Sequence, residues 1–92
     1  MKLLSEREIA IKLKSLRGWK RNGDEIYKTF VTRDFVTAMG FVQSVALVAE
    51  KMDHHPDIHI RWNKVTLVLS THSAGGLTQN DFTLAHQFNQ LK

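Results

Sequence analysis

Residues 50–72, EKMDHHPDIHIRWNKVTLVLSTH, form the stretch of the chain that decides the fold. Beyond Pro56, apolar and polar side chains alternate with a period of two in two short runs. Such alternation is typical of strands that bury one face, and Asn63 with Lys64 would make a two-residue hairpin loop between them. In that register the apolar residues pair on one face: Trp62 with Val65, Ile60 with Leu67, and Ile58 with Leu69. The stretch therefore predicts a β-hairpin with one buried face.

The same register gathers histidines at the open end of the hairpin. Continued outward, it places His55 opposite His72, although the two are 17 positions apart in the sequence. Directly opposed side chains have Cβ atoms roughly 4.5–5.5 Å apart. His54 is adjacent, and the end of a preceding helix brings Glu50 and Asp53. The register thus predicts a cluster of titratable side chains.

Two capping boxes mark helix starts near the two ends of the chain. Ser5 is followed three residues later by Glu8, and Thr78 is followed by Asp81 in the same way. Apolar residues recur at helical spacing after each box. The sequence therefore predicts a first and a last helix at these places.

The middle of the chain predicts a second hairpin and a long helix. Asn22 and Gly23 are the strongest short hairpin signal, and the alternation after them predicts a short strand, a turn and a longer strand. Asp34 is the expected N-cap of a helix over residues 35–52. Its apolar stripe should comprise Phe35, Ala38, Met39, Val42, Val45, Ala46 and Ala49. A second apolar flank leaves only a narrow polar strip, so we expect this helix to pack on a sheet and also on a second copy of the chain.

The resulting order is α-β-β-α-β-β-α. Paired hairpins of this kind predict an α+β fold, with a four-stranded antiparallel sheet and helices packed on one face. We expect one domain over residues 1–92, because the chain is too short for a second lobe.

Composition narrows the class of protein further. The absence of cysteine excludes disulfides, thiolate metal sites and cysteine nucleophiles. The N-terminus begins like a signal peptide but reaches Glu6 and Arg7 before a hydrophobic region develops, so we expect a cytoplasmic protein that uses no membrane. The net charge of +4 is spread along the chain, and Tyr27 near Lys28 is the one hint of a nucleic-acid-binding sheet face. We therefore do not expect nucleic acid as a partner.

The histidines could bind a metal, transfer protons or simply lie on the surface. His55 and His59 have the spacing of metal ligands on a helix, but Pro56 and the period of two argue for a strand, where they would lie roughly 13 Å apart. We therefore expect no metal site. Imidazole gives or accepts a proton near neutral pH, and no motif marks a nucleophile nearby. Proton transfer fits the cluster best, and inert surface histidines remain the alternative.

The segment resembles the pterin-4a-carbinolamine dehydratases, also known as dimerisation cofactors of a homeodomain transcription factor. Their signature runs from an acidic residue through His-His-Pro, an aromatic residue and a histidine to an aspartate. The matching residues here are Glu50, His54, His55, Pro56, Trp62, His72 and Asp81. The strings AEKMDHHP, NKVTLVLSTH and GLTQNDFTLA are similar to the family at nearly every diagnostic position. The resemblance extends from Gly18 to the last helix.

What the resemblance implies is dehydration of a 4a-hydroxytetrahydropterin to quinonoid dihydropterin and water, which recycles the pterin of aromatic amino acid hydroxylases. No cofactor is implied, since the pterin is the substrate. The residues carried over as catalytic are His54, His55 and His72, and those lining the pterin pocket are Asp53, Pro56, Ser70 and Thr71. Glu50, Asp81 and Trp62 would support them.

Within this set we expect His55 and His72 to be the acid–base groups and His54 to orient the substrate. Asp81 is explained by its capping box, and Trp62 by packing in the core. Glu50 either tunes a histidine or simply ends the helix.

The resemblance also implies an alternative function without catalysis. Animal members of the family bind the dimerisation helix of a transcription factor, so the chain could be a protein-binding module. The intact histidine set favours the enzyme. The family forms dimers and tetramers, and we expect at least a homodimer.

Overall fold

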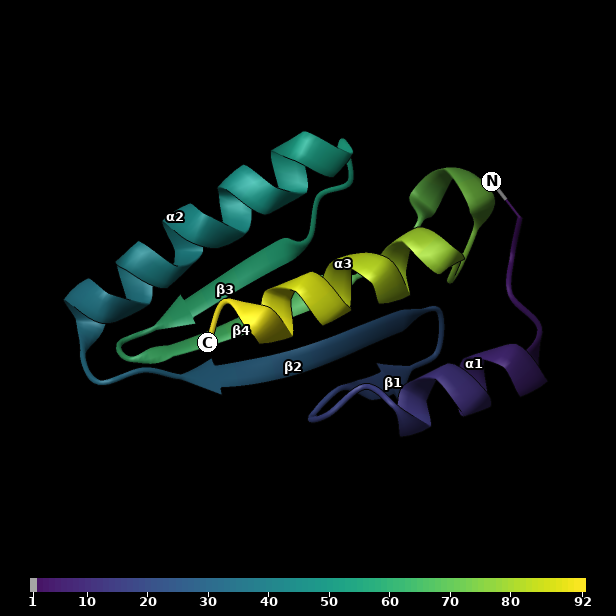
Figure 1. Cartoon of the computed structure of the whole chain (residues 1–92), viewed down its shortest axis with the longest axis horizontal. Coiled ribbons are helices and arrows are strands. Elements are labelled where there is room, and N and C mark those ends of the chain that lie inside the picture. Colours follow the sequence, from purple (N-terminus) through teal and green to yellow (C-terminus); the bar gives the residue numbers. More distant parts are fainter. Residues whose placement is uncertain (1) are drawn as a thin grey trace.

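The computed structural model describes residues 2–92 and confirms the predicted α+β fold with its order α-β-β-α-β-β-α. The elements in chain order are α1 (Glu6–Lys14), β1 (Lys20–Asn22), β2 (Glu25–Val31), α2 (Phe35–Met52), β3 (Asp57–Arg61), β4 (Lys64–Leu69), the 3-10 turn η1 (His72–Ala74) and α3 (Gln79–Gln90). The strands form one antiparallel sheet in the order β1-β2-β4-β3. Figure 1 shows α2 and α3 running in opposite directions, so the end of α2 lies on the same side of the molecule as the start of α3.

A hydrophobic core fills the space between the sheet and the helices. Because alternate strand residues point to opposite faces, β2 and β4 each turn one apolar set toward the helices. The strand side chains buried in this core are Ile26, Phe30, Val65, Leu67 and Leu69. Ile9 of α1, Val45 of α2 and Phe88 of α3 belong to the same cluster. On the opposite, open face the Thr29 and Thr66 hydroxyls hydrogen-bond across β2 and β4 at 2.8 Å.

The β3–β4 hairpin differs from the prediction in its register. The loop consists of Trp62 and Asn63, so Arg61 pairs with Lys64, whereas the prediction paired Trp62 with Val65. Each β3 residue faces a partner two positions earlier in β4 than predicted, and a shift of two preserves which side chains share a face. Trp62, however, leaves the strand, adopts φ 52° and exposes 64% of its surface. The expectation that Trp62 packs in the core is therefore wrong.

Contacts with Thr32, the residue directly after β2, explain why Asn63 belongs to this turn. The Thr32 N–H donates to the Asn63 carbonyl at 2.8 Å, and the Asn63 side-chain amide donates to the Thr32 carbonyl at 3.0 Å. These bonds hold Asn63 beside the end of β2. The positive φ that a tight two-residue turn requires consequently falls on Trp62.

The β1–β2 hairpin is displaced by a similar step. Asn22 pairs with Glu25, so the loop consists of Gly23 and Asp24 rather than of Asn22 and Gly23. Gly23 adopts φ 60° at the first loop position, where a residue without a Cβ atom is least strained. The predicted turn is thus correct in kind and wrong by one residue in position.

Helix α2 begins as predicted, and its buried stripe agrees with the predicted one only in part. Asp34 is its N-cap and accepts a hydrogen bond from the Thr37 N–H at 2.8 Å. Its buried residues are Ala38, Phe41, Val45 and Ala49, whereas Phe35 and Met39 of the predicted stripe are exposed. The helix faces the sheet through a stripe that includes Phe41, because Phe41 contacts Phe30 of β2 at a ring-centroid distance of 4.8 Å.

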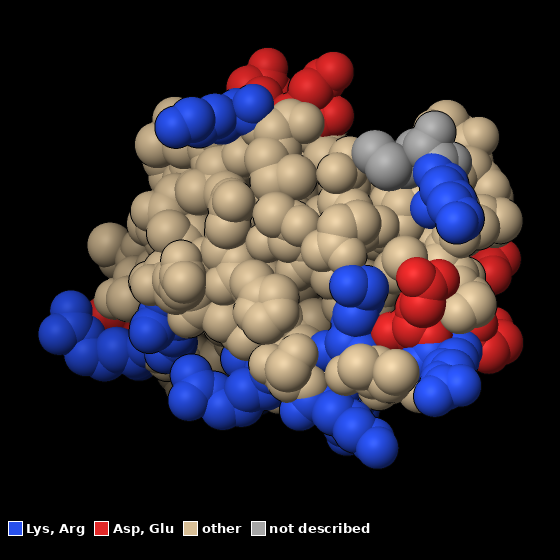
Figure 2. Space-filling view, turned by 45° about the vertical axis from the view of Figure 1, so that its right-hand side comes forward, with Lys and Arg blue, Asp and Glu red and all other residues tan. Residues whose placement is uncertain are grey.

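An uncharged outer surface remains on α2. Exposed apolar side chains on it are Phe35, Val36, Met39 and Leu47. By length and composition alone α2 could also cross a membrane, although its other face packs on the sheet. Figure 2 shows Lys and Arg gathered along the lower edge of the molecule, below a broad surface with few charged side chains.

Candidate active site

The predicted histidine cluster lies where the end of α2, the end of β4 and the 3-10 turn η1 come together. Asp53 is the C-cap of helix α2; it adopts the left-handed conformation at φ 52° and donates its backbone N–H to the carbonyls of Ala49 and Glu50. Asp tolerates this conformation better than most residues, and the sharp change of direction delivers the two adjacent histidines to the start of β3. A hollow of about 280 Å³ opens there, lined by Asp53, His54, His55, Ser70, Thr71, His72 and Ser73.

A buried carboxylate holds His54. The Nε2 atom of His54 lies 2.6 Å from Oδ1 of Asp81, and Asp81 is fully buried at the start of α3. Since a carboxylate only accepts hydrogen bonds, Nε2 of His54 carries the proton in this contact. Nδ1 is then the ring nitrogen left for a ligand in the hollow.

The second oxygen of Asp81 completes a buried network. Oδ2 accepts from the Thr71 hydroxyl at 2.8 Å and from the Thr78 N–H at 2.9 Å. The Thr71 and Thr78 hydroxyls are also 2.8 Å apart. Asp81 therefore caps α3, as its capping box predicts, and in addition fixes the ring of His54. The sequence pattern alone accounted for only the first of these two roles.

An exposed carboxylate holds His55. The Nε2 atom of His55 lies 2.9 Å from Oε1 of Glu50, which comes from the last turn of α2. Both side chains are largely open to solvent. Glu50 thus contacts a histidine besides belonging to the last turn of the helix.

His72 reaches the hollow by a route that the prediction missed. In the observed register, continued outward, Ser70 and not His72 is level with His55. Thr71 then forms an isolated bridge with Gly76, and His72 begins the 3-10 turn η1. The predicted direct opposition of His55 and His72 is therefore wrong, although both rings line the same hollow.

The remaining predicted residues divide into two groups. Asp53, Ser70 and Thr71 line the hollow, whereas Pro56 lies beside it without lining it. Trp62 lies in the turn at the far end of β3 and is outside this site. Ser73 also lines the hollow and was not predicted as a site residue. Its position directly after His72 is the feature of the sequence that indicates it.

The side chains of residues 2–92 do not form a metal-binding cluster. Within residues 2–92, no group of three His, Asp or Glu side chains is placed to hold a metal ion. The arrangement instead offers imidazoles, two of them with fixed carboxylate partners, beside hydroxyl groups in an open hollow. Such a set can donate and accept protons on a small polar molecule at neutral pH.

Comparison with protein families and curated proteins identifies similar sequences. The family model described as "Pterin 4 alpha carbinolamine dehydratase" matches residues 2–91. A Roseiflexus sp. protein that carries the name pterin-4-alpha-carbinolamine dehydratase is 56% identical over 88 residues, covering 96% of this chain and 95% of its own. A Thermomicrobium roseum protein with the same name is 46% identical over 91 residues, covering 99% and 98%.

Solved structures give the same picture at the level of the fold. A transcriptional coactivator/pterin dehydratase from Brucella melitensis superposes with a TM-score of 0.94 at 38% identity, over 98% of each chain. A pterin dehydratase-like protein described as a RuBisCO assembly factor in the alpha-carboxysome has a TM-score of 0.65 at 18% identity, over 79% of this chain and 84% of its own. The second likeness shows the fold alone.

Proposed function

The chain belongs to the pterin-4a-carbinolamine dehydratase family, whose members are hydro-lyases, and on that premise we propose that its histidine hollow carries out the dehydration by acid–base catalysis. The reaction removes the 4a-hydroxyl group of a 4a-hydroxytetrahydropterin as water and forms the quinonoid dihydropterin. It requires a proton on the leaving oxygen and loss of a proton from a ring nitrogen. The observation that carries the proposal is the gathering of His54, His55 and His72 around one hollow.

His54 is the orienting residue in this proposal. Its ring is nearly buried and its Nε2–H is committed to Asp81, so its position and tautomer are fixed before a substrate arrives. A side chain held in this way loses little further conformational entropy when it contacts a ligand. His54 therefore suits a hydrogen bond that places the pterin ring.

His55 and His72 are the proton-transfer residues. Both are exposed, which lets each ring exchange protons with solvent between turnovers. Glu50 accepts from Nε2–H of His55 and leaves Nδ1 for the substrate. The two rings reach the hollow from different segments, so one can protonate the leaving hydroxyl while the other removes the proton from nitrogen.

The polar side chains that line the hollow have different roles in this proposal. The Thr71 hydroxyl already forms hydrogen bonds with Asp81 and Thr78, so Thr71 supports the site indirectly, by holding Asp81. Ser70, Ser73 and Asp53 line the hollow with polar side chains that can contact the heterocycle directly.

A turnover assay tests the proposal. The 4a-carbinolamine is generated in situ, and the rate of dehydration above the spontaneous rate is measured for the parent and for His54→Ala, His55→Ala and His72→Ala. We expect His55→Ala and His72→Ala each to lower kcat by about 10²-fold or more, the usual scale for a general acid or base. An unimpaired His55→Ala protein would defeat the assignment of His55.

We also propose that the chain self-associates through the outer face of α2. Phe35, Val36, Met39 and Leu47 are exposed on one helix, and apolar patches of this kind usually mark contacts between proteins. Light scattering after size exclusion should give a multiple of the chain mass, and Leu47→Glu should reduce it. A single-chain mass for the parent would refute self-association.

The same face supports the alternative function, a protein-binding module that has no catalytic role. The two functions separate in the turnover assay, since a pure module would show only the spontaneous rate. An aromatic amino acid hydroxylase as the source of the substrate remains part of the enzymatic proposal.

A further inference from the structure

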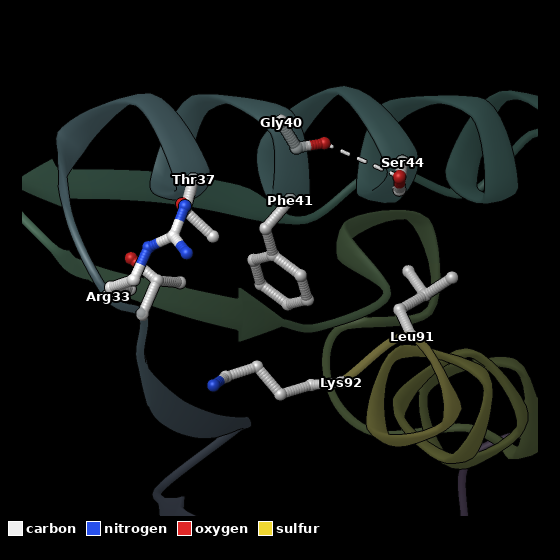
Figure 3. Close-up of a pocket in the computed structure, with 8 residues that line it drawn as sticks. Arg33, Thr37, Gly40, Phe41, Ser44, Leu91 and Lys92 are labelled. Carbon is white, nitrogen blue, oxygen red and sulfur yellow. Dashed lines mark hydrogen bonds between the residues drawn. The ribbon is translucent and has the colours of Figure 1, made fainter.

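A second hollow lies at the other end of the helix layer, away from the histidines. It has a volume of about 580 Å³ and opens between the first half of α2 and the C-terminal end of α3. Its lining residues are Thr32, Arg33, Thr37, Gly40, Phe41, Ser44, Leu91 and Lys92. Figure 3 shows Phe41 between the α2 ribbon above and Lys92 below, with Arg33 on one side and Leu91 on the other. The volume falls within the range of small-molecule sites in proteins.

The inner surface of this hollow is apolar and has room to accept a ligand. Phe41 is buried apart from a small exposed part, and Leu91 adds an aliphatic side chain. Gly40 lies on the exposed side of α2, and a Cβ atom placed on it would meet no other atom within 4 Å. The open space beside Gly40 can therefore hold the flat apolar body of a ligand against Phe41.

The rim of the hollow carries positive charge. Arg33 precedes α2 and Lys92 follows α3, so two cations that are 59 positions apart in the sequence line one cavity. Lys28 lies near this end as well: its pKa is lowered first by burial and then by the positive charges of Arg17 and Lys92. Lys92 therefore lies close enough to Lys28 for their positive charges to repel each other.

The carboxylate beside Arg33 is already engaged. Asp34 accepts the Thr37 N–H at 2.8 Å and lies 3.6 Å from Nε of Arg33. It is therefore poorly placed to bind a ligand ammonium group. The Thr37 N–H at the start of α2 is likewise used, which removes one of the backbone donors that phosphate sites at helix starts employ.

We propose that this hollow binds a small organic anion with a flat apolar body, of the aromatic carboxylate class. The carboxylate lies between Arg33 and Lys92, and the ring system lies over Phe41 beside Gly40. A guanidinium group suits a carboxylate through two parallel hydrogen bonds, and the Thr37 hydroxyl in the lining adds a further polar contact. This site is separate from the histidine hollow, with which it shares no lining residue.

Titration of the ¹⁵N-labelled full chain with 2-naphthoate, followed by NMR, tests the proposal. We expect saturable amide shifts centred on Thr37, Gly40, Ser44 and Leu91. The neutral analogue 2-naphthalenemethanol should bind several-fold more weakly, and the double variant R33Q/K92Q should weaken naphthoate binding by on the order of fivefold, the scale of exposed ion pairs.

Gly40 offers a blocking variant that preserves the helix. Gly40→Leu places an aliphatic side chain in the open space beside Gly40 and should abolish the naphthoate shifts, while Gly40→Ala provides a similar gain in helix propensity with far less filling. Lys51→Gln removes a cation elsewhere on α2 and should leave binding unchanged. The dehydratase turnover of Gly40→Leu should equal that of the parent.

Three results would overturn the inference. One is equal affinity for naphthoate and the neutral alcohol, since the charged rim would then play no part. Another is an unchanged titration of both Gly40→Leu and R33Q/K92Q. The third is a set of shifts centred on the histidine hollow or on Val36 and Leu47, which would place the ligand elsewhere.

Discussion

Two histidine–carboxylate pairs of similar geometry stand side by side in very different surroundings. The His54–Asp81 contact is 2.6 Å long, with side chains 12% and 0% exposed, whereas the His55–Glu50 contact is 2.9 Å long, with side chains 57% and 81% exposed. Asp81 also binds Thr71 and Thr78, while no further partner of Glu50 is found within residues 2–92. The first pair is part of the core, and the second lies on the surface.

The difference in burial gives the two histidine–carboxylate pairs different roles. When one partner of a buried carboxylate with three donors is removed, the protein loses much of its free energy of unfolding, because the remaining buried groups cannot form hydrogen bonds with water instead. An exposed pair is screened by solvent and contributes between nothing and about 1 kcal/mol. His54 is thereby fixed in place, while His55 is free to exchange protons.

Removal of Asp81 should produce the largest effect. Asp81→Ala leaves His54, Thr71 and the Thr78 N–H without their shared acceptor, so we expect a loss of about 3 kcal/mol in the free energy of unfolding. Urea unfolding followed by circular dichroism measures it. A loss below about 0.5 kcal/mol would show that the buried network stabilises nothing.

Asp81→Asn separates the structural from the orienting role of Asp81. The amide can still accept from Thr78, but its NH₂ group faces Nε2 of His54 and favours the other tautomer of the ring. We expect most of the stability to be retained and kcat to fall by at least about tenfold. Retention of full kcat would contradict the idea that the tautomer of His54 matters.

Thr71→Val should have an intermediate effect. It removes one donor to Asp81 and keeps the shape of the side chain, so we expect a loss of about 1–2 kcal/mol in stability. Thr71→Ser is the matched control and should restore most of it. Equal melting temperatures for the Val and Ser variants would argue that the hydroxyl is dispensable.

Glu50→Gln should change stability by less than about 0.5 kcal/mol, because the pair with His55 is exposed. Its effect should instead show in kcat, which we expect to fall several-fold, because Glu50 accepts a hydrogen bond from Nε2–H of His55 and so orients the ring. An unchanged kcat would mean that Glu50 has no influence on proton transfer.

The smallest effect concerns Asp34, which is half-exposed and accepts a hydrogen bond from the backbone. The Thr37 N–H lowers the pKa of Asp34 below its ordinary 3.8, so its ionised form stabilises the fold above that pH and this contribution is lost as the pH falls through the lowered pKa. Asp34→Asn should therefore be slightly less stable than the parent near pH 6 and equal to it near pH 2. Urea midpoints at the two pH values measure this; a difference that grows on acidification would contradict the sign.

Local patterns in the sequence were sufficient for the element order and for much of the site. The box at Ser5 and Glu8 and the N-cap Asp34 are found where predicted, since capping depends on residues three positions apart. His54 and His55 also line the hollow as predicted, because they directly follow the end of α2. Their catalytic roles remain predictions.

Contacts between distant segments decided what the sequence left open. Asn63 is held by Thr32, the residue that follows β2, and this contact fixed the hairpin register and exposed Trp62. The pairing of His54 with Asp81 joins positions 27 apart, so no local pattern could reveal it. Period and capping are properties of neighbouring residues and can be read from the sequence. Register and buried hydrogen bonds depend on how complete elements pack, and only the tertiary structure determined them.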